Sequence, residues 1–325
     1  MQLRKIVSVM TAAVMTAGVF SACSVPGADD GKLTVVTTIF PEYDWVMNVL
    51  GDNPAGAEVT MLVDNGVDIH SYQPSVSDIT LIGTCDVFVY VGGESDQWVA
   101  DALSQAVNKD MIVIDLMDVL SSSVVEEEVV EGMQADDEEE SEGEEETEFD
   151  EHVWLSLRNA GVIVDAIADA LSQADPDNAD TYAANAASYN DELTALDARF
   201  TDAVAGGSTD TILFGDRFPF RYLTDDYGLN YYAAFAGCSA ETEASFETIT
   251  FLAQKVDELG LHAVLTIDGS DQRIAETIVS NASSSDVQIL TMNSMQSVTS
   301  ADAANGVTYL SAMEDNLNIL TEALS

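Results

Sequence analysis

The sequence predicts an α/β protein with two lobes, each a mostly parallel sheet flanked by helices, joined by one long rigid helix. Three observations predict this class. Short runs of β-branched and aromatic residues alternate with helical patterns, one helical pattern of about 28 residues then runs without interruption, and the alternation resumes behind it. Such alternation is typical of βαβ units, which build parallel sheets.

The first lobe is expected to contain four strands, at 32–40, 58–64, 86–93 and 111–115. Helical patterns lie between them at 41–52, 75–85 and 94–108. Ser75 is placed to cap the second of these helices. A low-complexity acidic run at 121–151 is expected to be a disordered, solvated loop. We assign 33–175 to this lobe.

The long helix is expected from Asn178 to Ala205, because Pro176 interrupts the helical section before it and Gly206-Gly207 end the pattern. At 1.5 Å per residue it is a rod of about 42 Å, long enough to bridge two lobes. We assign 176–207 to this linker helix and 208–325 to the second lobe. Strands of the second lobe are expected at 211–216, 229–235, 262–268 and 287–293, with helices at 218–228, 245–260, 270–282 and 306–324.

The N-terminus has the layout of a secretory signal: Arg4 and Lys5 precede an apolar stretch at 6–20, and small residues follow. The end of this segment resembles a bacterial lipoprotein processing site, although Phe20 replaces the more usual leucine. We expect 1–22 to be removed, Cys23 to carry lipid, and 23–32 to tether the protein to the extracellular face of the membrane. An ordinary signal peptide cleaved near Ala22 is the alternative. No other segment has the roughly 20 apolar residues of a transmembrane helix, so lipid alone is expected to anchor the protein.

The charge of the chain excludes two kinds of partner. The formal net charge is −48, and sixteen carboxylates lie within 126–151, where no Lys or Arg occurs. Nucleic acid and anionic lipid are therefore excluded as partners held by charge. The acidic run either raises the local concentration of divalent cations or is a solvated spacer, and the sequence leaves both alternatives open.

Two of the three histidines lie where open α/β sheets bind ligands. His70 follows the second expected strand, and His152 precedes a helix in the segment DEHVWLS. Loops at strand ends and helix starts form the binding crevices of such sheets. His262 opens a strand and is interpreted as structural. Cys85 and Cys238 are interpreted as buried, small apolar residues, and a disulfide between them is not indicated.

Several segments, in order, resemble the metal-binding solute-binding lipoproteins of ABC importers, the zinc and manganese family that includes the adhesin-type lipoproteins. These segments are the lipoprotein start, GVDIHSYQPS, the acidic insertion, DEHVWLS, DPDNADTYAANAASY and DDYGL. Together they span essentially the whole mature chain. The resemblance implies two α/β lobes with a divalent metal in the cleft between them, His70 and His152 as ligands, and a membrane permease as the partner. We expect a monomer that is not an enzyme.

The resemblance is weaker at the ligands expected from the second lobe. The family carries a histidine or glutamate where this chain has Gly215, so the adjacent Asp216 becomes the expected donor. The last family position falls on Asn293. The alternatives are carboxylates on loops of the same lobe that are also placed to cap helices, Asp268, Glu241 and Glu243. Two imidazoles with one or two oxygens suit Zn²⁺ best and Mn²⁺ next.

Two other classes of function stay open. A zinc metallohydrolase would also use histidines and aspartates, but the chain has nothing like His-Glu-x-x-His. Hydrolysis of esters or peptides by the zinc-loaded protein would favour this class. A surface adhesin would bind a host or matrix partner through the acidic run. Binding that survives the replacement of His70 and His152 would favour the adhesin.

Overall fold

The structure is a computed structural model, and it describes residues 32–134, 148–239 and 243–325 of the chain. These residues belong to one compact unit, Lys32–Ser325. Within the described ranges, no helix combines the length and the apolar character needed to cross a membrane. The expected signal peptide, Cys23 and most of the tether lie outside the described residues.

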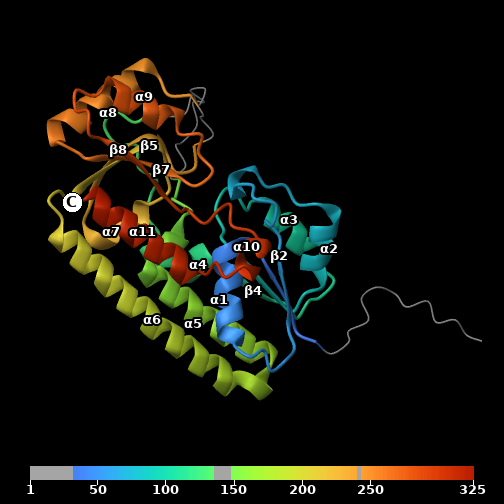
Figure 1. The fold of residues 1–325 in the computed structure, drawn as a ribbon. Helices are drawn as coiled ribbons and strands as arrows, with labels where there is room; N and C mark the ends of the chain where they lie inside the picture. The colour runs from blue at the N-terminus through green and yellow to red at the C-terminus, as the bar shows by residue number, and fades with distance from the viewer. Residues whose placement is uncertain (1–31, 135–147, 240–242) are drawn as a thin grey trace, which may run out of the picture. The chain divides into compact units, whose positions relative to one another are not determined.

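Two parallel four-stranded sheets form the framework, which confirms the predicted fold class (Figure 1). The strand order is β2-β1-β3-β4 in the first sheet and β6-β5-β7-β8 in the second. The strands are β1 Thr34–Thr37, β2 Glu58–Met61, β3 Val87–Tyr90, β4 Ile112–Asp115, β5 Thr211–Phe218, β6 Asn230–Ala236, β7 Ala263–Ile267 and β8 Gln288–Met292. In each sheet the chain moves from one side of its first strand to the other, and ligand crevices form at such switch points.

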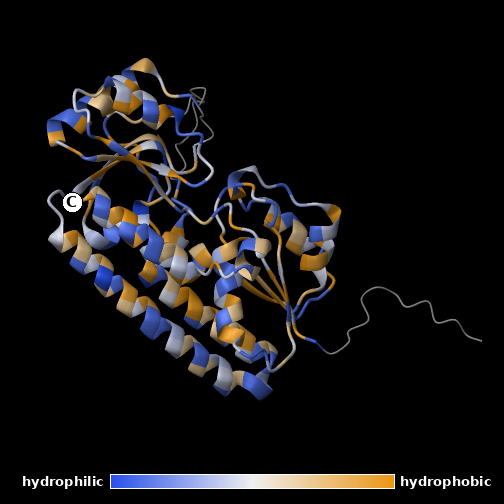
Figure 2. Ribbon diagram, viewed as in Figure 1, coloured by the Kyte–Doolittle hydropathy of each residue, from blue (hydrophilic) through white to orange (hydrophobic). Residues whose placement is uncertain are grey.

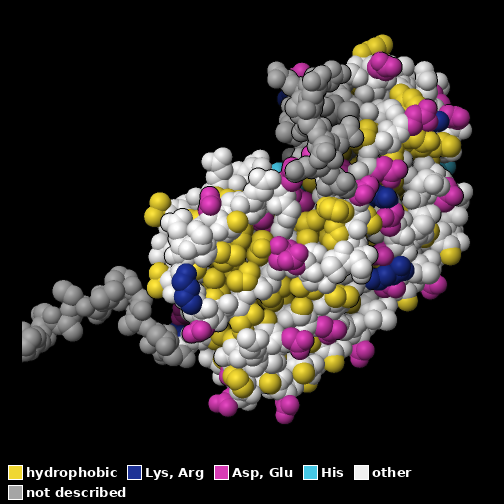
Figure 3. Space-filling view, turned by 180° about the vertical axis from the view of Figure 1, so that it is seen from behind, with side chains coloured by type: hydrophobic (Ala, Val, Ile, Leu, Met, Phe, Trp, Pro, Cys, Tyr) yellow, Lys and Arg dark blue, Asp and Glu magenta, His cyan; other side chains and the backbone are white. Residues whose placement is uncertain are grey.

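Both sheets consist of mostly apolar strands, as Figure 2 shows. Val87, Phe88 and Val89 of β3 are all fully buried, and so are Leu213 and Phe214 of β5. Strands covered by helices on both faces lose the alternation of apolar and polar residues. Carboxylates instead gather on the surface, where Figure 3 shows few Lys and Arg among them.

The first two helices of the first sheet start within one residue of the predicted positions, whereas α3 starts at Trp98, four residues later than predicted. The Ser75 hydroxyl accepts a hydrogen bond from the Asp78 amide, and the Asp78 carboxylate accepts one from the Ser75 amide at 2.7 Å, which confirms the predicted cap of α2. Pro41 lies in the first turn of α1, where its missing N–H costs nothing. The α-helices here are α1 Phe40–Leu50, α2 Val76–Thr84, α3 Trp98–Ser104 and α4 Leu116–Leu120, and the 3₁₀ turns are η1 Ile69–Ser71 and η2 Ser121–Ser123.

The helices of the second sheet also match the predicted order. Gly228 and Gly260 end α7 and α8 in the left-handed conformation that glycine adopts without strain. The sequence analysis did not foresee the short α4 and α10. The helices are α7 Arg221–Tyr227, α8 Phe246–Leu259, α9 Arg273–Asn281, α10 Ser300–Ala304 and α11 Tyr309–Ala323.

The long helix is α6, Ala179–Gly206, and it runs along α5, Leu157–Ala174 (Figure 1). The 3₁₀ turns η3 Val153–Leu155 and η4 Pro176–Asn178 precede these two helices. The C-terminal helix α11 also connects the two halves, because the Tyr309 amide donates to the Asp44 carboxylate of α1 at 3.2 Å. One hydrophobic core accordingly includes residues of both sheets and of α5, α6 and α11.

The expectation of a disordered, solvated run at 121–151 is wrong at both described ends of the run, because Met133 on one side and Asp150 and Glu151 on the other are buried. The Gln134 amide donates to the Ala234 carbonyl at 2.9 Å, and the Gln134 side-chain oxygen accepts from the Ser245 amide at 2.7 Å. Apolar residues between the carboxylates therefore dock this segment on the second sheet. Residues 135–147 lie outside the described part of the chain.

Candidate metal site

His70 and His152 are brought together although they lie 82 positions apart in the chain. Their Nε2 atoms are 3.2 Å apart, and their ring centroids are 5.2 Å apart. His70 belongs to η1, whose start is capped by Asp68: this carboxylate accepts from the His70 amide at 3.0 Å. His152 stands directly before η3. The two loops therefore lie together, as the sequence led us to expect.

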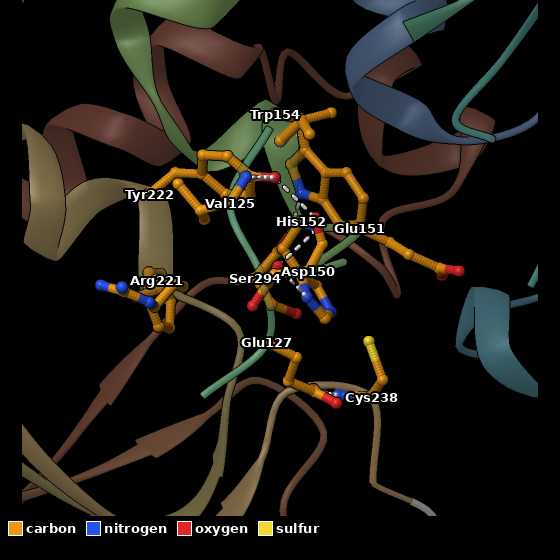
Figure 4. Close-up of polar contacts among 12 residues, drawn as sticks. Val125, Glu127, Asp150, Glu151, His152, Trp154, Arg221, Tyr222, Cys238 and Ser294 are labelled. Atoms are coloured by element: carbon orange, nitrogen blue, oxygen red, sulfur yellow. Dashed lines mark hydrogen bonds and ion pairs between the residues drawn. The ribbon is translucent and has the colours of Figure 1, made fainter. Parts of the chain in front are cut away.

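The His152 ring is held from behind by Asp150. One Asp150 carboxylate oxygen lies 3.0 Å from the ring Nδ1 and also accepts from the His152 amide at 2.8 Å (Figure 4). An ionised carboxylate only accepts hydrogen bonds, so Nδ1 carries the proton and Nε2 keeps a lone pair when the ring is neutral. His152 is fully buried, and Trp154 beside it donates its indole N–H to the Ser294 carbonyl at 2.8 Å.

His70 has a matching arrangement. Its Nδ1 lies 2.7 Å from the Ser95 hydroxyl, and the Ser95 amide in turn donates to the Glu151 carboxylate at 2.9 Å. The second Glu151 oxygen is 3.7 Å from the same Nδ1. This side of the ring therefore favours the tautomer with the proton on Nδ1, which directs the Nε2 lone pair toward His152.

The spacing of the two Nε2 atoms suits a metal ion. Two lone pairs pointed at each other repel unless a positive charge lies between them. Zn–N bonds of about 2.0–2.1 Å at a tetrahedral angle place two nitrogens about 3.3 Å apart. The separation here is 3.2 Å. Imidazoles whose outer nitrogen donates to a carboxylate or hydroxyl are the usual form of histidine ligands in proteins.

The charges around the two imidazole rings also favour a cation between them. Burial, followed by the charge of His152, lowers the pKa of His70 to about 4. Burial also acts to lower the pKa of His152, but the carboxylates of Asp150 and Glu151 outweigh it and raise that pKa. These carboxylates favour one positive charge between the rings, which either a proton or a metal ion can supply.

A third donor, Cys238, lies beside the two histidines. One ring nitrogen of each histidine and the Cys238 Sγ lie within 4.8 Å of one another, and no other group of this kind occurs among the described residues. Figure 4 shows the Cys238 side chain directed toward the His152 ring. Burial, and then the charges of Asp150, Glu127 and Glu151, raises the pKa of the thiol. A bound cation reverses such a shift, since a coordinating thiol is deprotonated.

A cavity of about 230 Å³ opens beside these donors. Its lining is acidic and includes Glu94, Ser95, Glu127, Glu148 and Glu151 in addition to His70 and Cys238. Burial raises the pKa of Glu127 and of Glu151. The cavity therefore suits a small cation rather than an anion or a large organic molecule.

The family of the chain follows from comparison with known proteins. Residues 35–323 match the family model described as ZnuA, zinc-uptake complex component A, periplasmic. The chain belongs to this family. It is also 32% identical over 302 residues to the zinc-binding lipoprotein AdcA of Streptococcus pneumoniae, covering 93% of this chain but only 58% of the relative.

Two further matches support the family. The high-affinity zinc uptake system protein ZnuA of Bacillus subtilis is 26% identical over 296 residues, which cover 90% of this chain and 88% of the relative. The Zn(II)-bound structure of the ZnuA-like domain of Streptococcus pneumoniae AdcA aligns with a TM-score of 0.69 and 29% identity, over 90% of this chain and 99% of that chain.

The two donors that the sequence suggested from the second lobe lie apart from this group. Asp216 lines a different cavity and accepts from the amides of Arg217 at 2.9 Å and Ile267 at 3.4 Å. The Asn293 side-chain oxygen accepts from the Met295 amide at 2.7 Å. Asp216 and Asn293 therefore remain only predicted metal ligands, and the positions of their side-chain oxygens do not support that prediction. Gly215 packs so closely on α9 that an added Cβ would lie 2.6 Å from the Ala275 Cα.

The contacts of the alternative carboxylates do not support a role as metal ligands either. Asp268 accepts from the Ser294 amide at 2.6 Å and from the Ser294 hydroxyl at 2.8 Å, and it also bonds the Ser297 hydroxyl. Glu243 contributes its backbone carbonyl to a contact with the Gln134 side chain at 3.5 Å. Glu241 lies outside the described residues.

Cys238 was not predicted as a donor. Its sequence context suggested a buried apolar side chain, whereas the structure places the thiol beside two histidines. The available signal was its position in the sequence: Cys238 lies three residues after the predicted strand 229–235, in the loop that also holds Glu241 and Glu243. His262, interpreted as structural, is exposed at the start of β7 and lies outside the site.

Proposed function

We propose that this protein is an extracytoplasmic receptor that captures a divalent transition metal and delivers it to an ABC permease. Zn²⁺ is the proposed cargo and Mn²⁺ the alternative. Membership of the zinc-uptake family supports the proposal, and so do the zinc-binding names of its relatives. The chain spans only 58% of the length of the pneumococcal relative, so the activity and partners of that longer protein are not transferred as a whole.

The observation that carries the proposal is the pair of facing imidazole nitrogens. His70 and His152 present their Nε2 atoms to each other at 3.2 Å, and each ring has its Nδ1 beside a polar partner. We propose both as direct metal ligands. A receptor binds and releases its cargo unchanged, so we propose no catalytic residue and no enzymatic activity.

The location and partners form part of the same proposal. Lipidation of Cys23 would hold the receptor on the extracellular face of the membrane, next to the permease, and the receptor would act as a monomer. Mass spectrometry of the protein from membranes tests the anchor. A diacylglycerol adduct on Cys23 that is absent from Cys23→Ser supports it, and an N-terminal peptide without lipid on the Cys23 sulfur overturns it.

The metal assignment is tested with the full-length protein by calorimetric titration of Zn²⁺ and Mn²⁺. His70→Ala and His152→Ala are each expected to weaken zinc binding by more than about tenfold, because outer-shell changes alone commonly cost that much. His262→Ala is the matched control, since it removes an exposed histidine outside the site. Wild-type zinc affinity in both site variants would overturn the assignment. An anomalous-scattering map of the zinc-loaded crystal identifies the ligand atoms directly.

A further inference from the structure

The second sheet contributes a sulfur atom to the histidine pair. Cys238 lies two residues beyond the end of β6, and its Sγ and one ring nitrogen each of His70 and His152 fall within 4.8 Å of one another. In a tetrahedral zinc site, bonds of about 2.3 Å to sulfur and 2.0–2.1 Å to nitrogen give an N···S distance of about 3.6 Å. The donors therefore need to approach one another by at most about 1.2 Å.

The backbone around Cys238 passes close to the His152 ring. Gly237 lies against the His152 ring so closely that an added Cβ would be 2.9 Å from its Cε1 and 2.9 Å from the Phe218 carbonyl oxygen. Only glycine lets the loop pass at this distance. On the other side, the Cys238 amide donates to the Glu127 carboxylate at 3.1 Å. Gly237 and Glu127 together set the position of the thiol relative to the two imidazoles.

Cys85 shows what a merely structural cysteine looks like in the same chain. It is buried beside Met111, and its thiol donates to the Ile82 carbonyl within the first lobe. Among the described residues, it belongs to no group of three or more potential metal donors. Cys238, by contrast, lines a cavity with His70 and four glutamates. The two free cysteines therefore have different surroundings and different expected roles.

We propose that the Cys238 thiolate is the metal ligand that the second lobe supplies, in place of the oxygen donors expected from the sequence. The inference rests on the proposed function, and it specifies the cargo further. On binding, the S–H bond breaks, the proton leaves to the Glu127 carboxylate or to water, and the sulfur lone pair forms the bond to the metal without any change of oxidation state.

The chemical consequence is selectivity for zinc over manganese. Thiolate is a soft ligand that suits Zn²⁺, whereas Mn²⁺ prefers carboxylate, carbonyl and water oxygens. Two imidazoles and one thiolate match the nitrogen and sulfur set of zinc sites. The acidic lining outside this set offsets the positive charge of the ion without supplying the closest donors.

The first test needs no variant. Co²⁺ added to the reduced full-length protein is expected to give the intense near-ultraviolet charge-transfer band of a Co²⁺–thiolate bond. A Co²⁺ complex that forms with His70 and His152 but lacks this band overturns the inference. If the wild-type protein binds neither Co²⁺ nor Zn²⁺, the proposed function itself fails, so the two failures are distinguishable.

The second test compares Cys238→Ala and Cys238→Asp with the matched control Cys85→Ala. Cys238→Ala is expected to abolish the charge-transfer band and to weaken zinc binding by more than about a hundredfold, since a direct ligand contributes more than its outer-shell partners. Cys238→Asp is expected to lower the ratio of zinc to manganese affinity. Cys85→Ala is expected to retain the band. Wild-type zinc affinity and zinc preference in both Cys238 variants would overturn the inference.

Discussion

Two cavities of this molecule contain similar polar residues but differ in what those residues do. The larger, of about 420 Å³, is lined by Asp68, Asp216, Arg217 and Asp268. Its carboxylates already have protein partners: Asp68 pairs with Arg217 at 2.5 Å, and Asp268 bonds Ser294 and Ser297. The smaller cavity, of about 230 Å³, lies beside two imidazoles and a thiol that face one another. The comparison shows that nitrogen and sulfur donors facing one another, rather than the number of carboxylates, locate the candidate metal site.

The largest expected effect is the stabilisation of the fold by bound metal. This effect shows which of the two cavities binds the metal. Zinc at about 1,000 times its Kd should raise the free energy of unfolding by about 4 kcal/mol, because it binds only the folded protein. A chelator should reverse this gain in a thermal melt. His152→Ala should lose the gain, and Asp268→Asn should keep it. The reverse pattern would assign the metal to the larger cavity.

A smaller effect is expected from the residue behind His152. Asp150→Asn replaces the carboxylate that orients the ring through Nδ1, and it should weaken zinc binding by roughly 10–100-fold. Calorimetric titration measures the change. Asp165→Asn on the exposed surface of α5 is the control, because Asp165 contacts only Asn190 among the bonds described for it. Unchanged zinc affinity in Asp150→Asn would show that the Asp150 carboxylate is not needed to orient the His152 ring.

The ion pair of the larger cavity, between Asp68 and Arg217, should contribute to the stability of the fold. Burial opposes ionisation of Asp68, but the charges of His70 and Arg217 outweigh it and lower the pKa of this carboxyl. The pair therefore stabilises the fold fully above the unfolded-state pKa of about 4, and this contribution disappears as the pH falls through the lower folded-state value.

Arg217→Met should accordingly reduce the free energy of unfolding by about 1 kcal/mol at neutral pH, and by less in acid. Chemical denaturation at a series of pH values measures this difference. Arg199→Met, which breaks the exposed pair with Glu314, is the control and should have a smaller effect at every pH. A cost of Arg217→Met that grows as the pH falls would contradict the assignment.

The smallest effect on zinc affinity is expected from a change of Asp216. This change tests directly which residue of the second lobe binds the metal. If Cys238 is the second-lobe ligand, Asp216→Asn should leave zinc affinity within about threefold of wild type, or about 0.6 kcal/mol. The sequence-based expectation is that Asp216→Asn weakens metal binding. Parallel titrations of Asp216→Asn and Cys238→Ala decide between these two residues.

The framework and the first-lobe histidines were predictable because their signals are local. β-branched strands alternate with capped helices, as at Ser75, and the ends of parallel strands meet at one edge of a sheet. His70 follows β2, and His152 follows the acidic segment at a helix entrance. Each position depends on a few neighbouring residues, so pattern and resemblance were sufficient to select both.

The second-lobe donor and the docked acidic segment were not predictable, because they depend on contacts between distant residues. Cys238 reaches His152 only because Gly237 passes the ring without a side chain and Glu127 holds the amide. Asp216 and Asp268 satisfy their oxygens with neighbouring amides and hydroxyls, which composition does not reveal. By itself the sequence determined the fold class and two imidazoles, since periodicity and strand ends are local. The tertiary structure decided which group of the second lobe lies beside them, since that depends on how loops distant in the sequence pack together.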